Sequence, residues 1–407
     1  MNRRDFLKTS GSFALAASLA ELAFLPAARA QGEAPWFFVQ IAITGGWDIT
    51  LGADPWLTAL PDQRDMYIEY NPSDIARIGN IAFGPSMLPI KNYASRLCVV
   101  NGVFLSPSDN GHGAAERYMQ SGSTNQSWGD FGVEVLETRP AELMGVATNS
   151  SVYLGVRGQL VTQLGNVPSF MNGSSAPFQS SQNDRNLISR IEAGLAGSAQ
   201  KLKTLKDIVE MFKQQGSNVG DLHHLAGLFG AGLSQIGVLS FNENLDTHAA
   251  HPGTHLAQQT KAWEKVAEVF DLFSKVEVNG SGQSLLDRTT FMITSEFSRT
   301  AALNTSNGKD HNPLTNSVVL LGPRIKGGTT IGGSNLVTHA QSKTGSSYHI
   351  ASPIDPATGL PTRVREGARI IRPENVAATL IESLGISRKR FASVPDQTLS
   401  LSKWALK

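Results

Sequence analysis

Short apolar runs recur along the chain, and most of them show little alternation with polar residues. Runs of this kind, bounded by Gly, Pro, Asn or Ser, are typical of strands buried on both faces of a mainly parallel sheet. They predict strands at residues 36–43, 96–104, 152–155, 236–241, 291–294 and 318–321. Between them, apolar residues at helical spacing predict helices at residues 183–215, 220–233, 253–276 and 373–384, and a helix start at 114–120.

Strands and helices therefore alternate along the chain. That order predicts an α/β fold, a three-layer sandwich whose mainly parallel sheet has helices on both faces. Residues 327–370 are rich in Gly, Ser and Thr and predict hairpins or a cover over the site. No interior boundary is evident, so residues 31–407 are expected to form one domain.

The first thirty residues have the pattern of an export signal. Arg3 and Arg4 form a twin-arginine pair, a moderately apolar stretch follows, and Ala28-Arg29-Ala30 is a small-x-small cleavage site. The mature chain should begin at Gln31 and be exported folded by the twin-arginine machinery, to the periplasm or the medium. The apolar stretch is too short to span a bilayer, so no membrane span is expected in the mature protein.

Composition narrows the function classes. A net charge of +1 over 407 residues gives no reason to expect nucleic acid as a partner. The one cysteine, Cys98, excludes a disulfide within the chain and a thiolate metal cluster. It lies in an apolar run and is expected to be a small buried hydrophobe.

Polar groups able to bind a cation follow the predicted strands. Ligands bind outside the carboxyl ends of strands in open α/β sheets, where residues distant in sequence converge. The groups at these ends are Asp48, the loop that contains Ser108 and His112, Asp246 with His248, Glu296, and Asp310 with His311. Carboxylates and imidazoles without thiols suit Zn, Mn, Mg or Ca.

Simpler interpretations exist for several of these residues. Taken alone, Glu296 could be a surface carboxylate and Asp310-His311 a polar pair in a loop. His248 is the better ligand of its group, whereas His251 and His255 are interpreted as solvated histidines at a helix start. Arg299 could hold an anionic substrate group through a bidentate contact or form an ordinary surface ion pair.

Several motifs together resemble a known family. They are the signal peptide, Gly45-Gly46-Trp47-Asp48, His112 within GHGAAERYMQSG, Asp246-Thr247-His248, residues 295–300 (SEFSRT) and residues 308–311 (GKDH). The set, which covers nearly the whole mature chain, is similar to an uncharacterised family of exported bacterial proteins related to alkaline phosphatases and sulfatases. The resemblance implies an alkaline-phosphatase-like sandwich with a two-cation site at the carboxyl edge of the sheet.

The resemblance also implies an activity, the metal-dependent hydrolysis of a small anionic phosphate or sulfate ester. The expected cation ligands are Asp48, Asp246, His248, Glu296 and His311, with Asp310 as a further ligand or as the residue that orients His311. Ser108 and His112 are the catalytic candidates, and Arg299 the substrate-binding one. The chain departs from the wider pattern at Glu296 and Phe297, where Asp and His are usual. A non-catalytic periplasmic binding or scaffold protein on the same fold is the alternative.

Overall fold

The computed structural model describes residues 36–58, 62–106, 111–125, 127–136, 146–149, 152–153, 161–171, 199–278, 281–364, 366–391 and 394–407. The export signal, the cleavage site before Gln31 and the catalytic candidate Ser108 lie outside these ranges. So does the first half of the helix predicted at residues 183–215.

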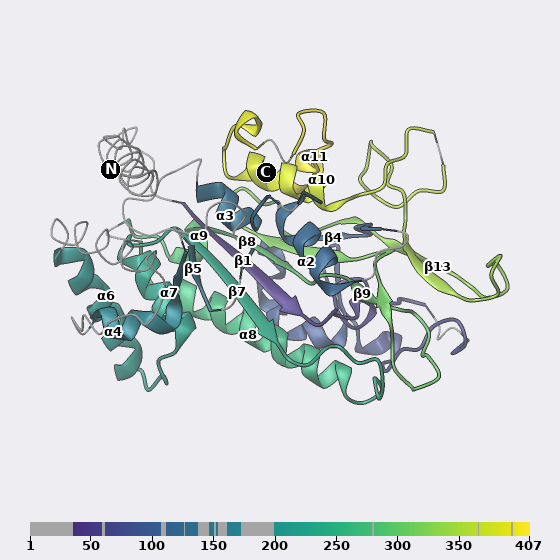
Figure 1. Ribbon diagram of the computed structural model, residues 1–407, viewed down its shortest axis with the longest axis horizontal. Helices are drawn as coiled ribbons and strands as arrows, with labels where there is room; N and C mark the ends of the chain where they lie inside the picture. The colour runs from purple at the N-terminus through teal and green to yellow at the C-terminus, as the bar shows by residue number, and fades with distance from the viewer. Residues whose placement is uncertain are drawn as a thin grey trace, which may run out of the picture.

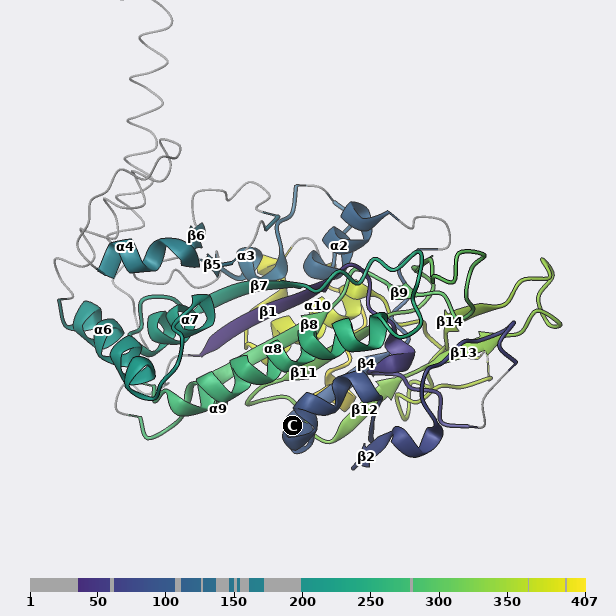
Figure 2. The same cartoon turned by 90° about the horizontal axis from the view of Figure 1, so that it is seen from below.

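A mixed, mainly parallel sheet forms the centre of the described part of the chain (Figures 1 and 2). Its eight strands follow the order β12-β4-β11-β8-β1-β7-β5-β6. Within this sheet β11 runs antiparallel to β4 and β8, and the other neighbouring pairs are parallel. The strands are β1 (Phe37–Thr44), β4 (Leu97–Asn101), β5 (Val146–Thr148), β6 (Val161–Gln163), β7 (Ile236–Asn242), β8 (Thr289–Thr294), β11 (Ser317–Leu321) and β12 (Thr329–Gly332).

Helices cover both faces of the sheet, which confirms the predicted three-layer arrangement (Figure 1). One face carries the 3₁₀ segment η3 (Pro85–Arg96), α6 (Ala199–Gln214), α7 (Asp221–Gly230) and α8 (His255–Lys275). The other carries α2 (His112–Ser121), α3 (Phe131–Leu136) and α10 (Pro373–Ser383).

The central strands bury both of their faces, as their unalternating sequences predict. In β1, Phe37, Val39 and Ile41 pack with α7 and α8, whereas Phe38 packs against Phe131 of α3 on the opposite side. Because neither face meets water, apolar residues are favoured at every position of such a strand. Cys98 of β4 is buried in the same way, as expected.

Residues 152 and 153 do not form the strand predicted at residues 152–155, and residues 154 and 155 lie outside the described ranges. The short strand in this region is β5, which lies upstream at Val146–Thr148. The backbone of Tyr153 is instead tied to the start of α3: its carbonyl accepts from the Asp130 amide at 2.8 Å, and its own amide donates to Asp130 Oδ2 at 3.3 Å. These bonds hold Tyr153 away from the sheet.

Two small ribbons lie beyond the main sheet, formed by β9 (Ser298–Arg299) with β10 (His311–Asn312), and by β13 (Ser334–Val337) with β14 (Tyr348–Ala351). The β13–β14 hairpin matches the hairpins predicted for residues 327–370, but β12 from the same region joins the edge of the main sheet. Among the described residues, no helix combines the length and apolar character needed to cross a membrane.

Candidate metal centre

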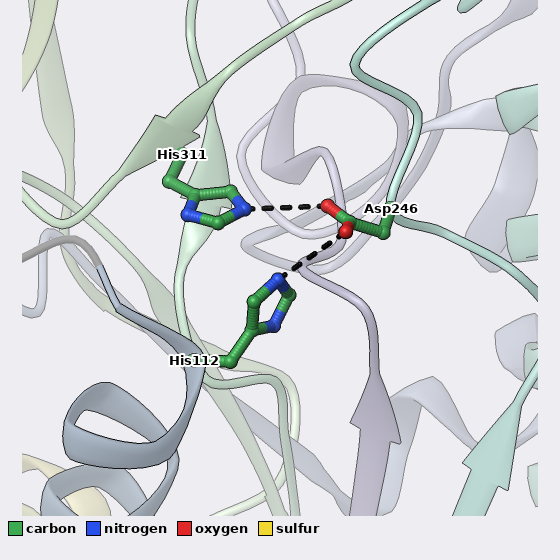
Figure 3. Close-up of side chains that lie close together, drawn as sticks. All are labelled: His112, Asp246 and His311. Carbon is green, nitrogen blue, oxygen red and sulfur yellow. Dashed lines mark hydrogen bonds and ion pairs between the residues drawn. The ribbon is translucent and has the colours of Figure 1, made fainter.

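The carboxyl edge of the sheet brings together side chains from four separate parts of the chain. Strands β4, β7 and β8 end at this edge and lead to His112, Asp246 and Glu296 respectively. Because β11 is antiparallel to them, the residues that precede it, including His311, reach the same edge. Figure 3 shows His112 and His311 pointing toward the carboxylate of Asp246.

Backbone pairing fixes the loops that carry these side chains. In the β9–β10 ribbon, His311 pairs with Arg299, which holds His311 beside the end of β8. The segment after β7 is bound to the segment before β10, since the Lys309 amide donates to the Thr247 carbonyl at 3.0 Å. Gly308 is required there, because a Cβ atom at this position would lie 1.9 Å from the carbonyl carbon and oxygen of His248.

Two imidazole nitrogens converge on one carboxylate oxygen. Nε2 of His248 and Nε2 of His311 lie 2.9 Å apart, and they lie 3.1 Å and 3.2 Å from Asp246 Oδ1. On the other side, Nε2 of His112 lies 3.4 Å from Asp246 Oδ2. Ligand atoms that share a zinc ion, each about 2.1 Å from it, lie about 3 to 3.5 Å from one another. The spacing therefore fits a common cation.

Two acidic residues set the tautomers of His248 and His112. Asp310 Oδ1 lies 2.8 Å from His248 Nδ1, and Glu296 Oε1 lies 2.8 Å from His112 Nδ1. A carboxylate accepts, so each Nδ1 carries a proton, and in the neutral imidazole each Nε2 presents a lone pair. Asp310 thus orients His248, which corrects the expectation that it would orient His311.

These lone pairs face a negative charge. Nε2 of His248 and Nε2 of His112 both point at the carboxylate of Asp246. Lone pairs and an anion repel unless a proton or a metal ion lies between them. The charges agree: Asp246, Glu296 and Asp310 with the guanidinium of Arg299 leave two net negative charges, which a divalent cation would balance. The residues therefore fit a divalent metal ion.

The pKa values reflect these contacts. Burial opposes the ionisation of Asp246, but the hydrogen bond and the charge of Arg299 lower its pKa to about 2. The hydrogen bond to Glu296 raises the pKa of His112 above its usual value. Glu296 is almost completely buried, which raises its pKa, yet its bonds to His112, the Gly45 amide and Ser295 bring that pKa below the usual value.

Both carboxylate oxygens of Glu296 accept hydrogen bonds within the protein. We expected it to bind the cation, but its oxygens already accept from His112, from the Gly45 amide at 2.8 Å and from the Ser295 hydroxyl at 2.9 Å. These bonds place it behind His112, as the group that fixes the orientation of that imidazole.

Arg299 is a buried cation in this structure, and its contacts are with the protein; the substrate-binding role expected for it stays a prediction. Its side chain has no exposed surface and lies 2.6 Å from Asp246 Oδ1. It also donates to the carbonyl oxygens of Gly45, Gly46 and Lys309. Gly45 and Gly46 have positive φ values of 103° and 77°, a conformation that aims both carbonyls at the guanidinium and favours glycine.

Asp48 lies at the same edge, but its carboxylate contacts Lys309 and Thr50 and not the Asp246 cluster, so its role as a cation ligand stays a prediction. It is completely buried, and its Oδ2 lies 2.5 Å from Nζ of Lys309. Its Oδ1 accepts from the amide and the hydroxyl of Thr50 at 2.9 Å and 2.7 Å, capping the turn η1 (Ile49–Leu51). Burial raises the pKa of Asp48, but Lys309 lowers it well below its usual range.

His251 and His255 are buried, whereas the sequence suggested solvated residues. Their Nδ1 atoms lie 2.9 Å and 2.8 Å from the hydroxyl of Thr247, between Asp246 and His248. Burial lowers both pKa values, that of His255 to about 3, so both imidazoles are neutral. Lys309 and Thr247 were not identified from the sequence; the GKDH and DTH motifs that contain them were the available signal.

Sequence and structure comparisons add a family of unknown function and distant structural neighbours. A family described as "Protein of unknown function (DUF1501)" matches residues 238–363, less than half of the chain. No curated protein matches the chain.

Among solved structures, a putative sulfatase from Bacteroides thetaiotaomicron is 11% identical over 91% of this chain and 74% of that chain, with a TM-score of 0.38. The alkaline phosphatase of the Antarctic bacterium TAB5 is 8% identical over 71% of this chain and 92% of that chain, with a TM-score of 0.31. The lipoteichoic acid synthase LtaP from Listeria monocytogenes is 8% identical over 77% of this chain and 73% of that chain, with a TM-score of 0.33. The functional proposal therefore rests on the geometry of the site.

Proposed function

We propose that the protein is an exported, metal-dependent hydrolase of phosphate or sulfate esters. The observation that carries the proposal is the convergence of His248 Nε2, His311 Nε2 and Asp246 Oδ1 within 3.2 Å of one another. Asp310 and Glu296 lie on the outer sides of His248 and His112, and they turn the Nε2 lone pairs of these two imidazoles toward Asp246. Carboxylate partners of this kind commonly orient metal-binding histidines.

The ligand types narrow the choice of cation. Asp246, His112 and His311 offer ligand atoms that lie within 4.8 Å of one another and would hold the ion. His248, whose Nε2 lies 3.1 Å from Asp246 Oδ1, would be a further ligand. Hard cations such as Mg and Ca prefer oxygen ligands, whereas imidazole suits Zn and other transition metals. Within the expected group of Zn, Mn, Mg and Ca, the site therefore favours Zn. When bound, such an ion would polarise an ester oxygen or acidify a water molecule.

The surrounding residues keep the ligands in place before any ion or substrate arrives. Arg299 fixes the Asp246 carboxylate from the interior, Asp310 fixes the ring of His248, and Glu296 fixes the ring of His112. His112 also begins α2, and the N-terminal end of a helix favours an anionic group nearby. These features suit an anionic ester as substrate. Ser108, four residues before His112, is the proposed nucleophile.

One observation favours the alternative function, a non-catalytic binding or scaffold protein. The ring of Phe297 stacks on His311 with ring centroids 4.1 Å apart, and lies 4.9 Å from His112. An apolar ring thus occupies a side of the cluster where a further polar ligand could stand. A single bound ion without turnover would fit this alternative.

Turnover of generic aryl phosphate and aryl sulfate esters distinguishes the two functions. The purified protein should be supplied with Zn²⁺ or Mn²⁺ and assayed with each ester class, beside the His112→Ala and Ser108→Ala variants. Hydrolysis that is lost in both variants supports the enzyme. Metal binding without hydrolysis of either ester supports the binding protein.

The proposal also includes the cellular location and the domain organisation of the chain. Arg3, Arg4 and the Ala28-Arg29-Ala30 site support export of the folded protein by the twin-arginine machinery to the periplasm or the medium. Residues 31–407 would then form the mature, alkaline-phosphatase-like domain. Export of a folded chain would allow the ion to be acquired before translocation.

A further inference from the structure

A second group of cation-binding side chains lies buried beside the candidate metal centre. Asp48 follows β1 at the carboxyl edge of the sheet and has no exposed surface. His251 is equally buried, and its Nε2 lies 3.5 Å from Asp48 Oδ2. Among the described residues, this nitrogen has no hydrogen-bond partner. A carboxylate and an unpartnered imidazole nitrogen at this distance are suited to share a cation.

The ammonium of Lys309 already lies against the carboxylate of this second cluster of side chains. Nζ of Lys309 lies 2.5 Å from Asp48 Oδ2, and its side chain is almost completely buried. The backbone of Lys309 is held on both sides, because its amide donates to Thr247 and its carbonyl accepts from Arg299, each at 3.0 Å. The ammonium is therefore a fixed part of the fold.

We propose that Lys309 replaces a second metal ion, so that the site binds one divalent cation per chain. This inference rests on the proposed function, since it concerns the number of ions that the same site takes. The Asp48–Lys309 pair is neutral and leaves no charge for a second divalent ion to balance. One ion suffices for the two net negative charges of the Asp246 cluster.

Metal stoichiometry tests the proposal on the full chain. The protein should be saturated with Zn²⁺, freed of excess metal on a desalting column and analysed by mass spectrometry of the metal. The expected result is one zinc ion per chain. Two ions per chain would overturn this inference and leave the proposed function standing. No bound ion would overturn both.

Paired variants test the part played by Lys309. Lys309→Ala removes the ammonium but keeps Asp48 and His251, and should take up a second zinc ion more weakly than the first. The matched control Asp48→Asn/Lys309→Ala, which also removes the carboxylate, should return to one ion. Circular dichroism checks that each variant is folded. Loss of the first ion in the folded Asp48→Asn/Lys309→Ala variant would show that Asp48 is a ligand and contradict the proposal.

Discussion

His248 Nε2 lies 2.9 Å from His311 Nε2, although Asp310 accepts a hydrogen bond from the Nδ1–H of His248 and so leaves a lone pair on that Nε2. The two nitrogens meet over an oxygen of Asp246 whose pKa is about 2. A positive charge at its centre, added to that of Arg299 at 2.6 Å from the same oxygen, would stabilise this arrangement. A metal ion supplies it at any pH at which the imidazoles are neutral, whereas protons supply it only when they are not.

Removal of the Asp310 carboxylate should weaken metal binding without unfolding the protein. Asp310→Ala leaves the His248 ring without its acceptor at Nδ1, so the ring loses its fixed orientation. The zinc affinity, measured by competition with a chromophoric chelator, should fall about 10- to 100-fold. The exposed control Asp207→Ala, on α6, should bind zinc as the wild type does. An unchanged affinity in Asp310→Ala would show that this carboxylate does not orient a ligand.

Loss of Arg299 should lower the free energy of unfolding. Arg299→Leu leaves the carbonyls of Gly45, Gly46 and Lys309 and one oxygen of Asp246 without their buried donor. We expect unfolding in urea to require about 3 to 5 kcal/mol less than in the wild type. The control Arg64→Leu removes an exposed ion pair with Asp62 and should leave the unfolding midpoint essentially unchanged. Equal midpoints for both variants would contradict the buried structural role of Arg299.

Asp130 should make the stability of the protein depend on pH. Burial raises its pKa to about 8, and its Oδ1 has no hydrogen-bond partner. Between about pH 4 and this raised pKa, the folded chain therefore holds a proton that the unfolded chain has released. The contribution of Asp130 to the free energy of unfolding therefore falls by about 1.4 kcal/mol per pH unit as the pH rises across that window.

Asp130→Asn removes the titratable carboxyl, so the folded and unfolded chains no longer differ in the proton bound at this position. Urea unfolding at pH 5 and at pH 7.5 should show the variant gaining stability relative to the wild type as the pH rises. A difference between the two proteins that stays constant over this range would show that Asp130 does not titrate with the raised pKa.

The twin-arginine pair should control export. Replacement of Arg3 and Arg4 by Lys keeps the charge but removes the guanidinium groups that the machinery recognises, so the precursor should remain in the cytoplasm. The control Lys8→Arg keeps the pair and should be exported. Cell fractionation and sequencing of the mature N-terminus measure export and cleavage. Normal export of the double variant would disprove the predicted route. A mature chain that starts at a residue other than Gln31 would disprove the predicted cleavage site.

The sequence predicted the sheet better than the details of its site. Buried strands such as β1 and β8 are visible as apolar runs because both of their faces meet helices. The antiparallel sense of β11 has no local signature, because pairing between distant strands decides it. Tyr153 was misjudged because its backbone bonds with Asp130 are long-range contacts.

In the site too, local sequence predicted some features, and contacts between distant residues decided the others. The presence of Asp246, His248, His311 and His112 at one edge follows from the positions of strand ends. Which carboxylates lie among the clustered histidines and which are neutralised by buried cations could not be predicted. Lys309 lies in a polar Gly-Lys-Asp segment that is typical of an exposed loop, yet it is buried against Asp48. The burial of Arg299 likewise depends on carbonyls that are about 250 residues away in sequence.

The zinc content of the wild type, compared with that of Asp246→Asn, tests the central claim most directly. Asn keeps the shape of Asp but removes the charge on which His248, His311 and His112 converge. The account predicts that the wild type retains zinc after desalting, and that a folded Asp246→Asn binds it at least about 100-fold more weakly. A wild type that binds no divalent ion, or a variant that binds zinc equally well, would contradict it.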